Sequence, residues 1–87
     1  MAVRSPEHRA LGQALRNLRS ERRMAQMELA FESGLDRTYV GGIERGERNP
    51  SYTSLRRIAI VLDIPVSEWI ARAEALEQGD DAPAPPR

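Results

Sequence analysis

Three consecutive side chains with hydrogen-bonding tips, Arg37, Thr38 and Tyr39, give this sequence its clearest chemical signal. The forked guanidinium of an arginine can bridge the O6 and N7 acceptors of guanine or bind phosphate oxygens. The threonine and the tyrosine can contact a thymine methyl group or a phosphate. A polar helix end held out on a rigid corner suits insertion into the DNA major groove. We therefore predict that these three residues contact bases.

The stretch 26–46 supplies such a corner, because it reads as two short helices joined by a tight turn. Gly34 stands where the backbone must reverse within about three to four residues, a place that favours positive φ and hence glycine. Ala30 is small where the two helices cross closely, and Val40 and Ile43 lie one turn apart on the inward face. The sequence thus predicts a helix-turn-helix.

Capping residues and apolar periodicity predict five helices and no strand. An apolar stripe of Leu55, Ile58 and Leu62, for example, recurs at helical spacing. We expect helices over about 6–23, 26–33, 37–45, 52–62 and 66–76, with caps at Ser5, Asp36 and Ser51 and a stop at Gly46. The fold class is therefore all-α, with one domain over 6–76, a flexible 1–5 and a disordered, acidic and Pro-rich 77–87.

Charge is unevenly distributed along the 87 residues, although the net charge is zero. Residues 1–57 contain 11 arginines and 7 acidic residues, whereas residues 58–87 contain 2 arginines and 6 acidic residues. The chain is therefore polarised, with a positive first part and a negative end that we expect to point away from a nucleic acid.

The composition argues against several functional classes. The absence of cysteine excludes disulfides, thiolate catalysis and cysteine-ligated zinc, and His8 is the single histidine. No nucleophile–base pair and no cofactor loop is visible, so we expect neither an enzyme nor a bound cofactor or metal. The longest apolar runs are far shorter than a membrane span, which favours a cytoplasmic protein with no membrane partner.

Residues 9–76 resemble the lambda-repressor/Cro-like helix-turn-helix family of bacterial and phage regulators. The stretch RTYVGGIERGERNPS (37–51) is most similar to small dimeric repressors and to restriction–modification controller proteins. The resemblance implies a sequence-specific transcriptional regulator that binds double-stranded DNA as a homodimer. Its operator would be near-palindromic, with half-sites about 34 Å apart. The residues that carry the resemblance are Gln26, Leu29, Ala30, Gly34, Leu35, Val40, Ile43, Glu44, Arg45, Gly46, Asn49, Pro50 and Ser51.

The resemblance also implies roles for individual residues. Arg19 and Glu44 match a partly buried salt bridge that ties the first helix to the third. Phosphate-contacting positions of the family include Arg45, Arg48 and Asn49. The alternative for the two arginines is simple solvent exposure, and the alternative for Asn49 is a turn-forming role. The expected phosphate-contacting residues are Gln26, Arg45, Arg48, Asn49, Ser51 and Tyr52.

Apolar residues on the last helix predict a symmetric dimer contact, in which a patch meets its own copy. The expected interface residues are Val66, Trp69, Ile70 and Ala73. Trp69 has a competing interpretation, in which it covers the core of its own domain. Phe31, an aromatic residue where family members usually carry a charge, either packs locally or marks an added partner contact. An antitoxin or another protein-interaction module built on the same fold is therefore the second hypothesis.

Two glycines, Gly41 and Gly42, interrupt the helix that begins at Arg37. Each destabilises a helix interior by about 1 kcal/mol relative to alanine. The sequence leaves three explanations open. The backbone approaches the groove closely, or the position of Gly42 reads nothing, or the helix is softened and orders only on DNA.

Overall fold

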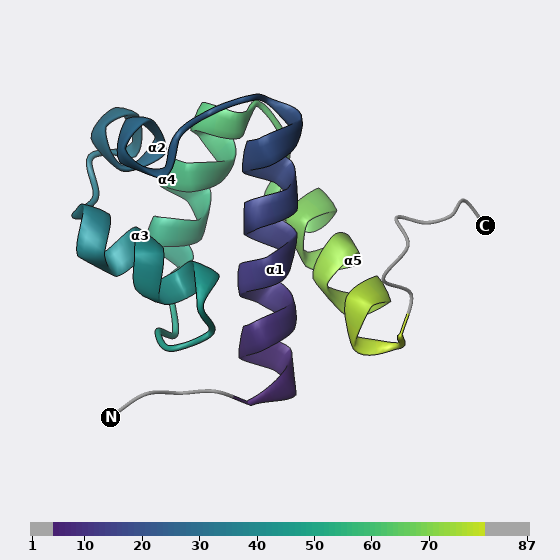
Figure 1. Cartoon of the computed structure of the whole chain (residues 1–87). Coiled ribbons are helices and arrows are strands. Elements are labelled where there is room, and N and C mark those ends of the chain that lie inside the picture. The colour runs from purple at the N-terminus through teal and green to yellow at the C-terminus, as the bar shows by residue number, and fades with distance from the viewer. Residues whose placement is uncertain (1–4, 80–87) are drawn as a thin grey trace.

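The computed structural model describes residues 5–79, and this range contains five helices and no strand (Figure 1). The predicted all-α fold is therefore confirmed. Of the expected flexible 1–5 and tail 77–87, all but Ser5 and residues 77–79 lie outside the described range. The helices are α1 (Pro6–Glu21), α2 (Gln26–Ser33), α3 (Arg37–Glu44), α4 (Tyr52–Leu62) and α5 (Val66–Glu77).

The first helix begins where predicted and ends earlier. The Ser5 hydroxyl accepts a hydrogen bond from the His8 N–H at 3.1 Å, and Pro6 occupies the first helical position. The helix ends at Glu21 rather than near residue 23, because Arg23 adopts a left-handed φ of 52°. The other predicted boundaries agree with the structure to within one residue.

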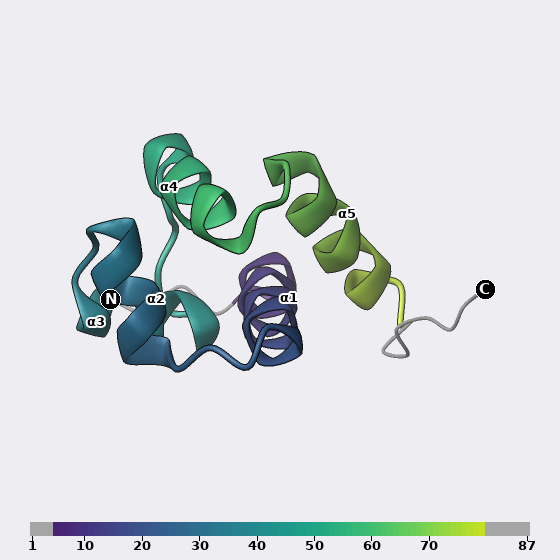
Figure 2. The same cartoon turned by 90° about the horizontal axis from the view of Figure 1, so that it is seen from above.

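Helix α1 lies in the middle of the fold, with α5 on one side and α2, α3 and α4 on the other (Figures 1 and 2). It packs against α3 and α5, while α2 packs against α3 and α4. Apolar residues from all five helices meet between these layers and exclude water, which is the main favourable term in folding. The largest side chains of this core are Leu15, Leu18, Leu29, Val40, Ile43, Ile58, Leu62 and Trp69.

The corner between α2 and α3 has the geometry that the sequence predicts. Gly34 adopts φ 74° and the Leu35 N–H donates to the carbonyl oxygen of Ala30 at 3.0 Å. This pair of features closes the end of α2 and turns the chain sharply. The side chain of Asp36 then accepts hydrogen bonds from the N–H groups of Thr38 and Tyr39, so α3 starts at a fixed point.

The end of α3 lies directly on α1. A Cβ atom added to Gly12 would stand 2.2 Å from the carbonyl oxygen of Ile43 and 2.6 Å from that of Glu44. A side chain at position 12 would collide with these carbonyl groups, so only glycine fits there. Gly12 therefore sets the distance between α1 and α3.

Candidate nucleic-acid interface

Helix α3 presents its first turn to solvent and its later residues to the core. Arg37 and Thr38 are exposed, whereas Val40 and Ile43 are 0% and 1% exposed. Because the buried pair is fixed by the core and the Asp36 cap fixes the first turn, the polar end of α3 is held rigidly outward. This arrangement has the stiffness and polarity that base recognition in a groove requires.

Tyr39 lies differently from its two neighbours. It is half-buried, packs against the core and donates its hydroxyl proton to the Ser54 Oγ at 3.1 Å. The Ser51 hydroxyl also donates to the Ser54 Oγ at 3.1 Å, and it accepts from the Ser54 N–H at the same distance. The phenol hydroxyl is thus used inside the protein, where it joins α3 to the cap of α4.

Two arginine side chains cover the two glycines of α3. A Cβ atom added to Gly41 would lie 3.1 Å from Arg45 Nη1, and one added to Gly42 would lie 2.5 Å from Arg48 Cγ. The helix runs without a break through both positions. The space left by the missing side chains is therefore filled by Arg45 and Arg48, an explanation outside the three that the sequence had left open.

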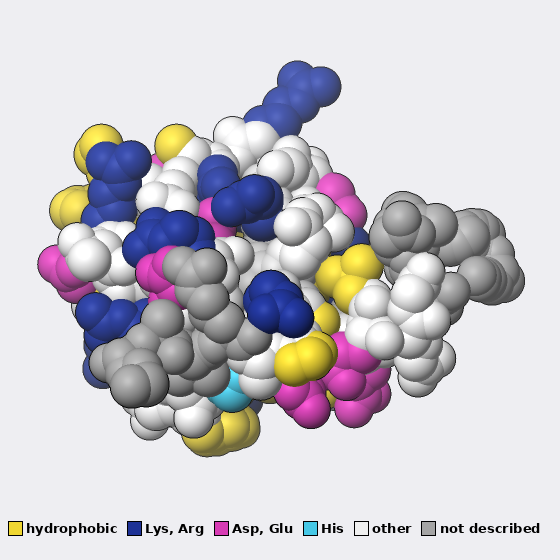
Figure 3. Space-filling model, turned by 60° about the horizontal axis from the view of Figure 1, so that its bottom comes forward, with side chains coloured by type: hydrophobic (Ala, Val, Ile, Leu, Met, Phe, Trp, Pro, Cys, Tyr) yellow, Lys and Arg dark blue, Asp and Glu magenta, His cyan; other side chains and the backbone are white. Residues whose placement is uncertain are grey.

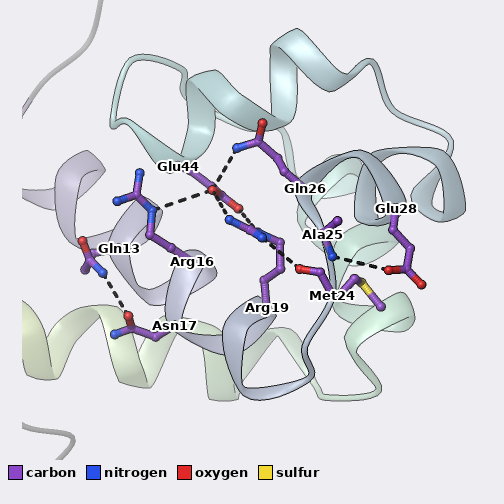
Figure 4. A network of polar contacts seen from close by, with 9 residues as sticks. All are labelled: Gln13, Arg16, Asn17, Arg19, Met24, Ala25, Gln26, Glu28 and Glu44. Carbon is purple, nitrogen blue, oxygen red and sulfur yellow. Dashed lines mark hydrogen bonds and ion pairs between the residues drawn. The ribbon is translucent and has the colours of Figure 1, made fainter.

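A buried carboxylate ties α1, α2 and α3 together (Figure 4). The side chain of Glu44 is 1% exposed and accepts hydrogen bonds from Arg19 Nε at 2.7 Å, Arg19 Nη2 at 3.0 Å and Gln26 Nε2 at 3.0 Å. The predicted salt bridge is thus present, and Arg19 also donates to the Met24 carbonyl oxygen at 2.9 Å. With its charge paired and its oxygens hydrogen-bonded, Glu44 tolerates burial.

Two further features of this network bear on the site. Gln26, expected to contact a phosphate, is half-buried, and its amide is oriented by Glu44 at the first position of α2. Arg16 Nε lies 3.9 Å from Glu44 Oε1, with a half-exposed side chain. Sequence reasoning missed Arg16, although its place one helical turn before Arg19 puts both on the same face of α1.

The remaining expected phosphate-contacting residues follow one another along the α3–α4 loop and the start of α4. They are exposed in every case, and Tyr52 retains 67% of its surface. Arg45 Nε pairs with Glu47 Oε1 at 3.1 Å. On the lower face of the molecule, arginines stand in several groups, while the largest acidic group in that view lies towards α5 (Figure 3). The loop residues are Arg45, Arg48, Asn49, Ser51 and Tyr52.

The expected dimer surface needs a correction. Trp69 and Ala73 are 0% and 3% exposed in the single chain, because α5 turns this stripe onto α1. Trp69 therefore covers the core of its own domain, the alternative that the sequence allowed. Val66 and Ile70 are half-buried and keep an accessible edge.

A shallow groove lies beside that edge, between the end of α4 and the start of α5. Its apolar lining includes Ile60, which is 65% exposed, together with Ile64 and Val66. Arg56 and Asp63, of opposite charge, also line it. The groove lining thus combines apolar side chains with one positive and one negative group.

A second exposed apolar group stands on α2. Phe31 is 85% and Met27 is 59% exposed, and the two residues are one helical turn apart. Phe31 therefore does not pack locally into the core, which leaves a partner contact as the interpretation for this position.

Within residues 5–79, no helix is long and apolar enough to cross a membrane. The same range contains no group of three or more His, Cys, Asp or Glu residues that suits a metal ion.

Comparison with known proteins places this geometry among DNA-associated regulators. A helix-turn-helix family profile matches residues 15–69. The immunity repressor protein of Bacillus phage phi105 is 34% identical over 68 residues, which is 78% of this chain and 47% of the repressor. The chain therefore spans about half of that relative's length.

Two solved structures share both the fold and much of the sequence. The restriction–modification controller protein C.AhdI from Aeromonas hydrophila superposes with a TM-score of 0.74 at 46% identity, over 75% of this chain and 98% of that one. The controller protein C.Esp1396I, solved as a tetramer with its natural 35 base-pair operator, superposes with a TM-score of 0.76 at 31% identity. That match covers 85% of this chain and 97% of the other.

Proposed function

The chain belongs to the Cro-like helix-turn-helix family of transcriptional regulators, and we propose that it binds a specific operator in double-stranded DNA. Within this family it would act as a restriction–modification controller protein, because the match to C.AhdI has 46% identity and spans 98% of that protein. Regulation would follow from occupancy of the operator, in the cytoplasm and without a catalytic step.

The observation that carries this proposal is the exposed, rigidly capped first turn of α3. Arg37 offers a guanidinium for guanine, and Thr38 offers a hydroxyl and a methyl group for a neighbouring base. Both side chains stand on a helix whose other face is locked into the core by Val40 and Ile43. Tyr39 would contact DNA with the edge of its ring, because its hydroxyl already donates a hydrogen bond to Ser54 Oγ.

Backbone contacts would set the register of the helix in the groove. The amide of Gln26 and the free N–H groups at the start of α2 would bind one phosphate, with Arg16 close by across Glu44. The next phosphate would be bound by the exposed polar residues of the α3–α4 loop and of the start of α4. These residues are Arg45, Arg48, Asn49, Ser51 and Tyr52.

A homodimer fits a near-palindromic operator, and we place its contact at the α4–α5 groove rather than on Trp69 and Ala73. A two-fold axis through this groove would bring Ile60 and Val66 against their own copies. The same rotation pairs the Arg56 side of one groove with the Asp63 side of the other. Apolar contact and opposite charges would then both favour the pairing of two copies.

Selection of duplexes from a random library, followed by titration of the winner at several salt concentrations, tests the proposal. We expect a near-palindromic winner and a steep fall of affinity with salt, because each arginine–phosphate contact releases counterions. Equal affinity for the selected and scrambled duplexes would contradict sequence-specific binding.

A second candidate function rests on Phe31 and Met27. An exposed aromatic and an exposed methionine one turn apart are typical of a contact with another protein. An antitoxin or protein-interaction role would use this face of α2. Stoichiometric co-purification of a partner that is lost in Phe31→Ala, together with no DNA retardation, would favour that role.

A further inference from the structure

The position of Gly42 in α3 lies on the face that carries the exposed polar residues. Thr38 and Gly42 are four residues apart, so they lie one above the other on the same side of the helix. A side chain at position 42 would therefore point in the direction of the groove that Thr38 faces. Glycine supplies no atoms there.

The arm of Arg48 fills that position from the loop. A Cβ atom added to Gly42 would lie 2.5 Å from Arg48 Cγ, 3.3 Å from its Nε and 3.5 Å from its Cδ. These three distances show that the aliphatic chain of Arg48 runs along the outer side of α3. An alanine at position 42 would collide with the root of that arm rather than with its free tip.

The ring of Tyr39 supports the other end of the arm. The guanidinium carbon of Arg48 lies 5.9 Å from the centre of the Tyr39 ring, within the range of a cation–π contact. The position of the ring is itself fixed, because the Tyr39 hydroxyl donates a hydrogen bond to Ser54 Oγ and Ser54 Oγ accepts another from the Ser51 hydroxyl. Gly42 and Tyr39 thus form a fixed seat for Arg48.

The two covering arginines differ in their charge partners. Arg45 Nε is paired with Glu47 Oε1 at 3.1 Å, which draws that guanidinium towards the loop. Arg48 is exposed, and no carboxylate of residues 5–79 forms an ion pair with it. Its guanidinium donors are therefore available for acceptors outside the protein.

We propose that the seat formed by Gly42 and Tyr39 holds Arg48 against the groove face of α3, so that Arg48 contacts a base edge instead of a phosphate. Gly42 and Tyr39 are then positioning residues for specificity, and Arg48 substitutes for the side chain that position 42 lacks. The inference rests on the proposed function and changes one assignment within it, because Arg48 moves from the phosphate-binding residues to the base-reading residues.

The affinity of the full chain for the selected operator and for its single-base-pair variants tests this seat. The proteins compared are wild type and the variants Arg48→Ala, Gly42→Ala, Gly41→Ala and the Gly42→Ala/Arg48→Ala pair. Gly41→Ala is the matched control, because it adds the same methyl group against the movable tip of Arg45 and in ordinary contact with the Gln26 amide, at 3.1 Å and 3.4 Å. Circular dichroism establishes that each variant is helical.

Arg48→Ala should remove a preference of about tenfold at one operator position, within the range expected for an arginine–guanine pair. Gly42→Ala should remove the preference at that same position even though alanine favours the helix. The double variant should be no worse than Arg48→Ala alone, and Gly41→Ala should keep the wild-type profile. Tyr39→Phe should retain the preference better than Tyr39→Leu, since it keeps the ring.

Uniform weakening by Arg48→Ala on every duplex, with a flatter salt dependence, would identify a phosphate contact and overturn the inference. An unchanged profile in Gly42→Ala would overturn the seat. Either result, obtained beside a wild-type protein that is sequence-specific, leaves the proposed function standing. A wild-type protein with no sequence preference would contradict both.

Discussion

The indole Nε1 of Trp69 donates a hydrogen bond of 3.0 Å to the main-chain oxygen of Leu11. This bond joins α5 to α1 across 58 positions of sequence, and the indole is fully buried. The last helix is therefore anchored to the domain through Trp69, and the dimer contact proposed above lies beyond this residue, at the α4–α5 groove.

Replacement of that indole by a phenyl ring tests the anchor. Trp69→Phe keeps an aromatic group but leaves the Leu11 carbonyl without its donor and opens a small cavity. We expect a loss of about 1–3 kcal/mol in the free energy of unfolding. Urea titration followed by circular dichroism measures it, with the exposed Tyr52→Phe as control. A change of oligomeric state with no loss of stability would contradict the burial of Trp69 in the core.

Removal of the Glu44 carboxylate should be more damaging. Glu44→Ala leaves Arg19 and Gln26 without their shared acceptor in a buried site, and the loss of one partner of such a pair costs about 3–5 kcal/mol. Thermal or urea unfolding measures the difference. Glu47→Ala, which removes a carboxylate from the loop, should change stability by less than about 1 kcal/mol. A loss of stability in Glu44→Ala that is as small as the loss in Glu47→Ala would show that the Glu44 network is not structurally important.

In the proposed dimer, a charge placed in the groove between α4 and α5 should separate the subunits. Ile60→Asp places a carboxylate at an exposed position, so the fold should persist while the subunits separate. Sedimentation should show a shift from dimer to monomer, and affinity for the full operator should fall at least about tenfold because the second half-site no longer gains from linkage. The control Met27→Asp alters a similarly exposed residue on α2. A dimer that survives Ile60→Asp would exclude this interface.

One surface ion pair makes stability depend on pH. Arg72 donates two hydrogen bonds to Glu21, which hold the pKa of that carboxyl below its ordinary value of 4.5. Because the pKa is depressed in the folded state, the stabilisation is present at neutral pH and is lost as the pH falls below 4.5 through the depressed value. Both side chains are about a third to a half exposed, so the contribution is about 0.5 kcal/mol.

The comparison of wild type with Glu21→Gln measures the contribution of this ion pair to the free energy of unfolding. The difference in unfolding free energy between the two proteins should be present at pH 7 and should shrink progressively as the pH is lowered below 4.5. A difference that stays constant over this range would assign the effect of the substitution to something other than the ion pair.

The local signals of the sequence were sufficient for the corner and its caps. Gly34 marked the left-handed turn and Asp36 the start of α3, because both effects act within three residues. The inward pair Val40 and Ile43 followed from helical periodicity, and both residues are buried. The Arg19–Glu44 pair followed from the family resemblance rather than from spacing.

Relationships across long separations were not readable in the same way. The periodicity of α5 predicted an apolar stripe but not which layer covers it, so Trp69 was expected at a subunit contact although it meets Leu11. The cover over Gly41 and Gly42 depends on how the arms of Arg45 and Arg48 fold back from the loop. No local pattern encodes that path, since it depends on packing against Tyr39 and on the ion pair with Glu47.

The base preference of Arg37→Ala is the most direct test of the account, because Arg37 is the exposed arginine at the capped end of α3. Affinities of wild type and variant are measured for the selected operator and each single-base-pair change in it. We predict that the variant loses discrimination of about 1–3 kcal/mol at one position in each half-site and keeps it elsewhere. An unchanged preference and affinity, in a protein that remains folded, would contradict the assignment of α3 as the helix that reads DNA.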